Sequence, residues 1–105
     1  MTTQQARDDQ PGIRMIAGVS EIADQFDGYL VDLWGCVHNG IEPYPAAVTA
    51  LLELRKRGKS ICMLSNGPRR AVDLIARLDQ MGVPRDAYQH VMSSGEATWL
   101  SLIHI

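Results

Sequence analysis

A carboxylate and a serine stand at two points of the sequence where buried strands are expected to end. Asp32 directly follows the apolar residues 29–31, and Ser65 and Asn66 directly follow the apolar residues 61–64. Consecutive parallel strands are usually neighbours, so their carboxyl ends should meet at one edge of a sheet. Ligands of open α/β sheets bind outside these carboxyl ends. The pattern therefore predicts one functional site that contains Asp32, Ser65 and Asn66.

The chemistry that suits this set of residues is phosphoryl transfer. Main-chain N–H groups around Asn66, together with the Ser65 hydroxyl, would lie where a helix begins, and such a place binds anions. A carboxylate opposite it can attack phosphorus and form an aspartyl-phosphate. Two anions in one site require a cation, and Mg²⁺ prefers oxygen ligands. The alternative is structural, with Asp32 capping a turn and Ser65-Asn66 capping a helix.

Three apolar segments that alternate with helical patterns predict the scaffold. Strands are expected at residues 29–32, 60–64 and 89–92, and the first of them reads as buried on both faces. Helical spacing of apolar residues follows each strand. This β-α-β-α-β-α order is typical of a parallel sheet with right-handed crossovers. The predicted fold class is α/β with a Rossmann-like parallel sheet.

Capping and breaking residues predict where the helices begin and end. Ser20 is expected to cap a short helix that runs through Asp24. Pro43 and Pro45 open the next helix, which Gly58 ends. A third helix should begin near Pro68 and stop at Gly82, and a fourth should start near Glu96.

Composition restricts the class of protein. The chain has 105 residues, of which 46% are hydrophobic, and a net charge of -2, as in a globular α/β domain. No apolar run reaches the roughly 18 residues of a membrane span, and no signal peptide is apparent, so a cytoplasmic location is expected. Without a basic stripe, neither nucleic acid nor a membrane is an expected partner. Cys36 and Cys62 lack the spacing of a zinc site or a disulfide framework.

The two ends of the chain differ from its middle. Residues 1–18 are mostly polar and predict a disordered or extended tail, whereas residues 19–99 carry the α/β pattern. Residues 100–105, Leu-Ser-Leu-Ile-His-Ile, look like the in-frame translation of a sequencing adapter. This interpretation predicts a truncated gene product, and an ordinary apolar helical turn is the alternative.

The two strand-ending motifs resemble those of the haloacid dehalogenase superfamily of phosphohydrolases. Its first motif, Asp-x-Asp-Gly, corresponds to Asp32-Leu33-Trp34-Gly35, and its second, a strand-ending Ser or Thr, corresponds to Ser65. Residues 40–47 and 93–98 look like the subfamily IIA, or NagD-like, branch, which inserts an α/β cap after the third strand. The Asp-x-Trp-Gly sequence is most similar to an uncharacterised branch of that subfamily.

The resemblance implies a role for each residue of the site. Asp32 would be the nucleophile and a Mg²⁺ ligand, the main-chain carbonyl of Trp34 a second ligand, and Ser65 and Asn66 would bind phosphate. The substrate would be a small phosphorylated metabolite, and the full-length protein a homo-oligomer. The chain would supply the first three β-α units of the core, without the cap, the C-terminal part, and the Lys and acidic pair found there.

One position departs from the superfamily pattern. Trp34 stands where the family normally has the Asp that protonates the leaving group and activates water. His38 and Glu42 are candidates to replace that Asp, and Arg69 is a candidate contact for a substrate anion. The alternative function is a non-catalytic protein of the same fold that binds phosphate or nucleotides. A receiver-like signalling domain fits less well, because no further acid neighbours Asp32.

Overall fold

The strands form one parallel sheet at the centre of the molecule. The computed structural model describes residues 12–104. Its sheet has the order β1-β2-β3, with β1 at Gly28–Asp32, β2 at Ser60–Ser65 and β3 at His90–Ser93. Asp32 pairs with Leu64, and Ser65 pairs with Ser93. The predicted α/β class, the Rossmann-like parallel sheet and the pairing of the first two strands are confirmed.

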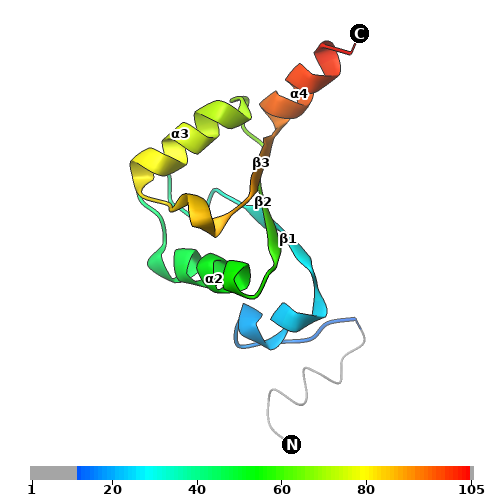
Figure 1. The fold of residues 1–105 in the computed structure, drawn as a ribbon, viewed down its shortest axis with the longest axis vertical. Helices are drawn as coiled ribbons and strands as arrows, with labels where there is room; N and C mark the ends of the chain where they lie inside the picture. The colour runs from blue at the N-terminus through cyan, green and yellow to red at the C-terminus, as the bar shows by residue number, and fades with distance from the viewer. Residues whose placement is uncertain (1–11, 105) are drawn as a thin grey trace, which may run out of the picture.

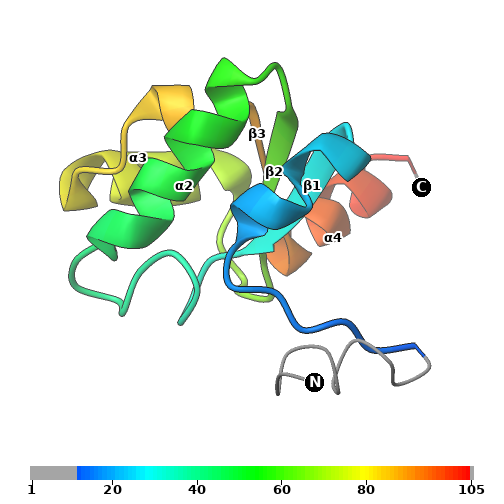
Figure 2. The same cartoon turned by 90° about the horizontal axis from the view of Figure 1, so that it is seen from below.

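Two helices lie on the same side of this sheet. In Figure 1 and in the turned view of Figure 2, α2 (Pro45–Lys56) and α3 (Ala71–Met81) both lie on the left of the strands. The helix α4 (Ser94–Leu102) extends from the end of β3 toward the C-terminus. Three short 3₁₀ turns complete the described part: η1 (Val19–Glu21), η2 (Ala23–Gln25) and η3 (Arg85–Ala87). No helix within residues 12–104 is long and apolar enough to cross a membrane.

The helix ends match the sequence pattern except at the start of α3. Pro45 occupies the first turn of α2, and Gly58 follows its end with a φ of 79°. Gly82, with a φ of 92°, ends α3 as a left-handed cap. However, α3 begins at Ala71 and not near Pro68, because residues 66–70 form a loop held by contacts with α4 that are described below. We call residues 66–70 the β2–α3 loop.

The region before β1 differs from the prediction. Ser20 caps no helix: residues 19–25 form the two 3₁₀ turns η1 and η2, and Gly18 holds the N-cap position of η1 without a side-chain bond. The Tyr29 hydroxyl donates to the carbonyl of Ala23 at 2.8 Å, which fixes this turn against β1. Of the predicted tail at residues 1–18, the first eleven residues lie outside the described part of the chain.

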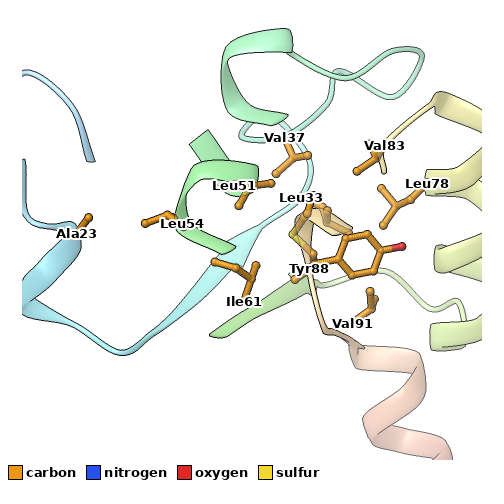
Figure 3. Packing of buried hydrophobic residues seen from close by; sticks show 12 residues of the cluster. Ala23, Leu33, Val37, Leu51, Leu54, Ile61, Leu78, Val83, Tyr88 and Val91 are labelled. Carbon is orange, nitrogen blue, oxygen red and sulfur yellow. The ribbon is translucent and has the colours of Figure 1, made fainter. Parts of the chain in front are cut away.

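The hydrophobic core lies between the sheet and the pair α2 and α3. Leu33, Val37, Ile61, Met63 and Leu78 have fully buried side chains. Figure 3 shows residues of β2, β3, α2, α3 and their connecting loops converging there. Leu33 and Val37 belong to this core, which therefore anchors the loop that follows the carboxyl end of β1.

The prediction that the first strand is buried on both faces is wrong. Side chains of β1 alternate between exposed and half-buried, and Leu30 is 74% exposed. The reason is that β1 is an edge strand and, among residues 12–104, α2 and α3 cover only the other face of the sheet. Tyr29 and Val31 pack against the core, whereas Leu30 and Asp32 share the open face.

This asymmetry predicts different effects of two truncations in neighbouring strands. Ile61→Ala removes a fully buried side chain and should lower the free energy of unfolding by about 2–5 kcal/mol. Leu30→Ala removes an exposed one on the paired strand and should change it by about 0.5 kcal/mol or less. Urea unfolding followed by circular dichroism measures both. Equal destabilisation by the two substitutions would contradict the core described here.

Candidate functional site

The sheet brings Asp32 and Ser65 to the same edge, on adjacent strands. The ladder between β1 and β2 continues one residue past Asp32, since the Leu33 N–H donates to the Leu64 carbonyl at 3.1 Å. Asp32 is exposed at the end of β1, and Ser65 is half-buried at the end of β2. The two residues on which the phosphoryl-transfer prediction depends are therefore neighbours in the fold.

The β2–α3 loop begins with a turn that orients the Ser65 hydroxyl. The Gly67 N–H donates to Ser65 Oγ at 3.1 Å, so this oxygen already accepts one hydrogen bond. The hydroxyl proton remains able to donate to a ligand. The neighbouring Asn66 is exposed at the tip of the turn. The prediction that the main-chain donors around Asn66 lie where a helix begins is wrong, because α3 starts at Ala71 and the Gly67 N–H is bonded to Ser65. The Ser65 hydroxyl proton and the exposed Asn66 are the donors that this turn presents.

The start of α4 holds the β2–α3 loop by direct backbone contact. The Gly95 N–H donates to the Gly67 carbonyl at 3.1 Å, and the Ser93 hydroxyl donates to the Arg69 carbonyl. A Cβ on Gly95 would overlap the carbonyl oxygen of Pro68. Only glycine allows this approach, so residues 93–95 fix the position of the loop.

Glu96 links α4 to the first turn of α3. Its carboxylate accepts from the Ala71 N–H at 2.9 Å and from two nitrogens of Arg70 at 2.6 and 3.1 Å. The Arg70 guanidinium also lies over the Trp99 ring, 4.4 Å from its centroid. The hydrogen bonds from Arg70 and then from Ala71 lower the pKa of Glu96 from 4.5 to about 2.

The sequence indicated Glu96 only as the start of a helix. The spacing Ser93-x-x-Glu96 is that of a capping box, and Ser93 does cap α4 by accepting from the Glu96 N–H at 2.9 Å. The Glu96 side chain, however, caps α3 and not its own helix. A pattern within one segment carries no signal for a partner 25 residues away.

The loop between β1 and α2, residues 33–44, forms the other wall of the site. The Trp34 ring packs on Gly40, where a Cβ would overlap it, and meets the His38 ring edge-on at 5.6 Å. The Arg77 guanidinium of α3 donates to the Gly40 carbonyl at 2.9 Å. Asn39 Oδ1 accepts from two main-chain N–H groups at 2.9 Å each and closes the turn. We call residues 33–44 the β1–α2 loop.

His38 is buried within this loop and is held in its neutral form. Its Nδ1 accepts from the Gly40 N–H at 2.9 Å, which assigns the ring proton to Nε2. Burial and then the charge of Arg77 lower the pKa of His38 below its usual 6.5. His38 therefore serves as a hydrogen-bond donor, because protonation of Nδ1 would break its bond with Gly40.

Two oxygens at this edge suit a hard cation. The Asp32 carboxylate is exposed, and the Trp34 main-chain carbonyl accepts no hydrogen bond from the described residues. Mg²⁺ is commonly bound through one or two carboxylates and several waters, so this pair fits part of its shell. Within residues 12–104 there is no group of three or more His, Cys, Asp or Glu side chains arranged for a metal.

Comparison with known proteins identifies the class to which this fold and site belong. Residues 29–104 match the family described as haloacid dehalogenase-like hydrolase, and the chain belongs to this family. No curated protein matches the chain.

Two solved structures of hydrolases are similar to the chain. A haloacid dehalogenase-like hydrolase from Brucella suis 1330 is 33% identical with a TM-score of 0.77, over 80% of this chain and 32% of that one. A 4-nitrophenylphosphatase from Thermotoga maritima is 26% identical with a TM-score of 0.65, over 79% of this chain and 32% of that one. The chain thus spans about a third of the length of these relatives.

The contact between α4 and the β2–α3 loop predicts a sharp response to one methyl group. Gly95→Ala should displace the loop and lower the free energy of unfolding by about 1–3 kcal/mol, because the added Cβ meets backbone atoms. Gly28→Ala is the matched control, since its Cβ would make only ordinary contacts of 3.7 Å with Ser60. Thermal unfolding and the amide chemical shifts of residues 65–67 and 69–70 report the two effects. Unchanged shifts in Gly95→Ala would contradict the assigned contact.

The lowered pKa of Glu96 predicts a pH dependence. A carboxyl group with a lower pKa in the folded state stabilises the fold above its unfolded pKa of 4.5, and this stabilisation disappears as the pH falls toward about 2. Glu96→Gln should therefore have a lower melting temperature than the wild type at pH 7, and the difference should shrink at pH 2.5. Glu53→Gln, which alters an exposed ion pair with Lys56, should show little difference at either pH. If the melting temperatures of the wild type and Glu96→Gln differ by the same amount at pH 7 and pH 2.5, the lowered pKa of Glu96 does not stabilise the fold.

Proposed function

We propose that this chain contributes the nucleophile and the phosphate-binding loop of a phosphohydrolase that cleaves phosphate monoesters. The observation that carries the proposal is the juxtaposition of Asp32 and Ser65 at the carboxyl ends of paired strands. Membership in the haloacid dehalogenase-like hydrolase family and the similarity to a 4-nitrophenylphosphatase support it.

The reaction would proceed in two displacements. An Asp32 carboxylate oxygen attacks phosphorus, the bond from phosphorus to the ester oxygen breaks, and the alcohol leaves with a proton. Water then attacks the aspartyl-phosphate, releases inorganic phosphate and restores the carboxylate. The Ser65 hydroxyl and Asn66 would hold the non-bridging oxygens in both steps.

Mg²⁺ is the cofactor that we propose for this site. Asp32 and the Trp34 carbonyl would hold it, and its charge would offset the repulsion between the carboxylate and the phosphoryl group. The remaining ligands would come from water and from segments that the longer relatives have in addition.

The proton for the leaving group needs a donor other than Trp34. His38 offers its Nε2–H as a hydrogen bond, but its Nδ1 bond to Gly40 opposes a full proton cycle. The Glu42 carboxylate is exposed in the same loop and has no partner among the described residues. We infer that His38 polarises the site and that Glu42 or water carries the proton.

The finer assignments follow from the motifs. We propose the NagD-like branch, a small phosphorylated metabolite as substrate, a homo-oligomeric full-length protein and a cytoplasmic location. We further propose that residues 100–105 come from a sequencing adapter and that the 105 residues by themselves are inactive. The helix α4 continues through Leu102, which is compatible with either origin of these residues.

A non-catalytic phosphate or nucleotide binder is the second candidate. One observation favours it: the side chain two residues after Asp32 is the indole of Trp34, which packs on Gly40 and cannot transfer a proton. General acid–base groups contribute roughly 10²–10⁴-fold to a rate, so their loss leaves a slow enzyme or a binder.

Replacing Asp32 distinguishes the two candidates. In the full-length protein with Mg²⁺ and 4-nitrophenyl phosphate, Asp32→Asn should lower kcat by roughly a thousandfold or more, because an amide oxygen is a far weaker nucleophile than a carboxylate. Asp27→Asn is the matched control, since Asp27 lies just before the opposite end of β1 and should leave kcat unchanged. Phosphate binding without turnover in the wild type, unaffected by Asp32→Asn, would support the binder and contradict the enzyme.

A further inference from the structure

A pocket of about 210 Å³ lies directly beside Ser65, between the β1–α2 loop and α3. Its walls include Trp34 and His38 of the β1–α2 loop, Ser65 at the end of β2, Gly67 and Arg69 of the β2–α3 loop, and Arg77 of α3. Ser65 belongs both to this pocket and to the proposed phosphate site, so the two adjoin at Ser65, whereas Asp32 and Asn66 do not line the pocket.

The charges that line this pocket are all positive. Arg69 and Arg77 contribute two guanidinium groups, and none of the described residues that line it is acidic. Arg77 is held in place by its bond to the Gly40 carbonyl. The Arg69 side chain is exposed and makes no hydrogen bond or ion pair with the described residues. A cationic pocket without an internal counter-charge favours an anionic ligand.

The polar groups of the pocket are donors. Ser65 Oγ already accepts from Gly67, so its proton is free to donate, and the proton of His38 is on Nε2. Guanidinium groups donate only, and their planar fork matches a carboxylate or a phosphate. The pocket therefore offers donors from four separate elements to one anion.

We propose that this pocket binds a second anionic group, a carboxylate or a phosphate, on the alcohol that leaves during hydrolysis. The inference rests on the proposed function, because the first anionic group is the phosphoryl group at Ser65. Arg69 is the specificity-determining residue of this subsite, and Arg77 with His38 forms its fixed wall. Trp34, which is 68% exposed, also lines the pocket.

A set of matched esters tests the subsite. We would measure dissociation constants by calorimetry with Mg²⁺ in the Asp32→Asn protein, which prevents turnover. The probes are inorganic phosphate, glycerol 3-phosphate, 3-phosphoglycerate and 1,3-propanediol bisphosphate. The carboxylate or the second phosphate should improve affinity about tenfold over glycerol 3-phosphate, as expected for hydrogen bonds between charged groups. Whichever of the two gains more identifies the group that the pocket accepts.

The variant Arg69→Gln tests whether the second anionic group binds at Arg69. In this variant the ratio of the dissociation constants of glycerol 3-phosphate and the better doubly anionic probe should fall to about one. Arg57→Gln removes the same charge near Asp24, at the opposite end of β1, and should leave the ratio unchanged. Equal affinity for all three esters, or a ratio that Arg69→Gln does not alter, would overturn the subsite and leave the proposed function standing. If none of the probes binds, inorganic phosphate included, both proposals fail.

Discussion

The close approach of Gly95 to the carbonyl of Pro68 is the constraint on which the rest of the site depends. It lets the start of α4 lie against the β2–α3 loop, so that Gly95 and Ser93 bond to the carbonyls of Gly67 and Arg69. The loop then presents Ser65 and Asn66 at the end of β2 and delays the start of α3 until Ala71. The phosphate site that we propose would need this rigidity, because its donors must be fixed before the ligand arrives.

A second glycine contact, of Gly40 with Trp34, forms the facing wall. The departure from the usual Asp at position 34 therefore has a structural consequence as well as a chemical one: the indole packs the β1–α2 loop together. In the same loop His38 is buried and has a lowered pKa, and Arg77, which donates to the Gly40 carbonyl, lines the adjoining pocket. Trp34 thus both occupies the position where the family resemblance implies an acid and lines the pocket beside Ser65.

Much of the fold follows from local pattern. The three strands, the helix that Pro45 opens and Gly58 follows, and the end of α3 at Gly82 all lie where the sequence predicts them. The predicted neighbours Asp32 and Ser65 also meet, because consecutive parallel strands pair. The predicted cap at Ser20 and the two-sided burial of residues 29–31 are wrong. Both depended on packing partners, which the residues of a single segment do not specify.

The sequence by itself determined the class of fold and the placement of Asp32 and Ser65 at the carboxyl ends of paired strands, where we propose the site. These features depend on the spacing of apolar residues, on the glycines and prolines that end helices, and on the parallel pairing of consecutive strands. All three can be read from local sequence or from the order of the elements. Only the tertiary structure decided that Glu96 caps α3, that His38 is buried and neutral, and that Arg69 and Arg77 face one pocket. These depend on contacts between residues 25 or more positions apart, or on burial by distant elements, and such contacts leave no spacing rule in the chain.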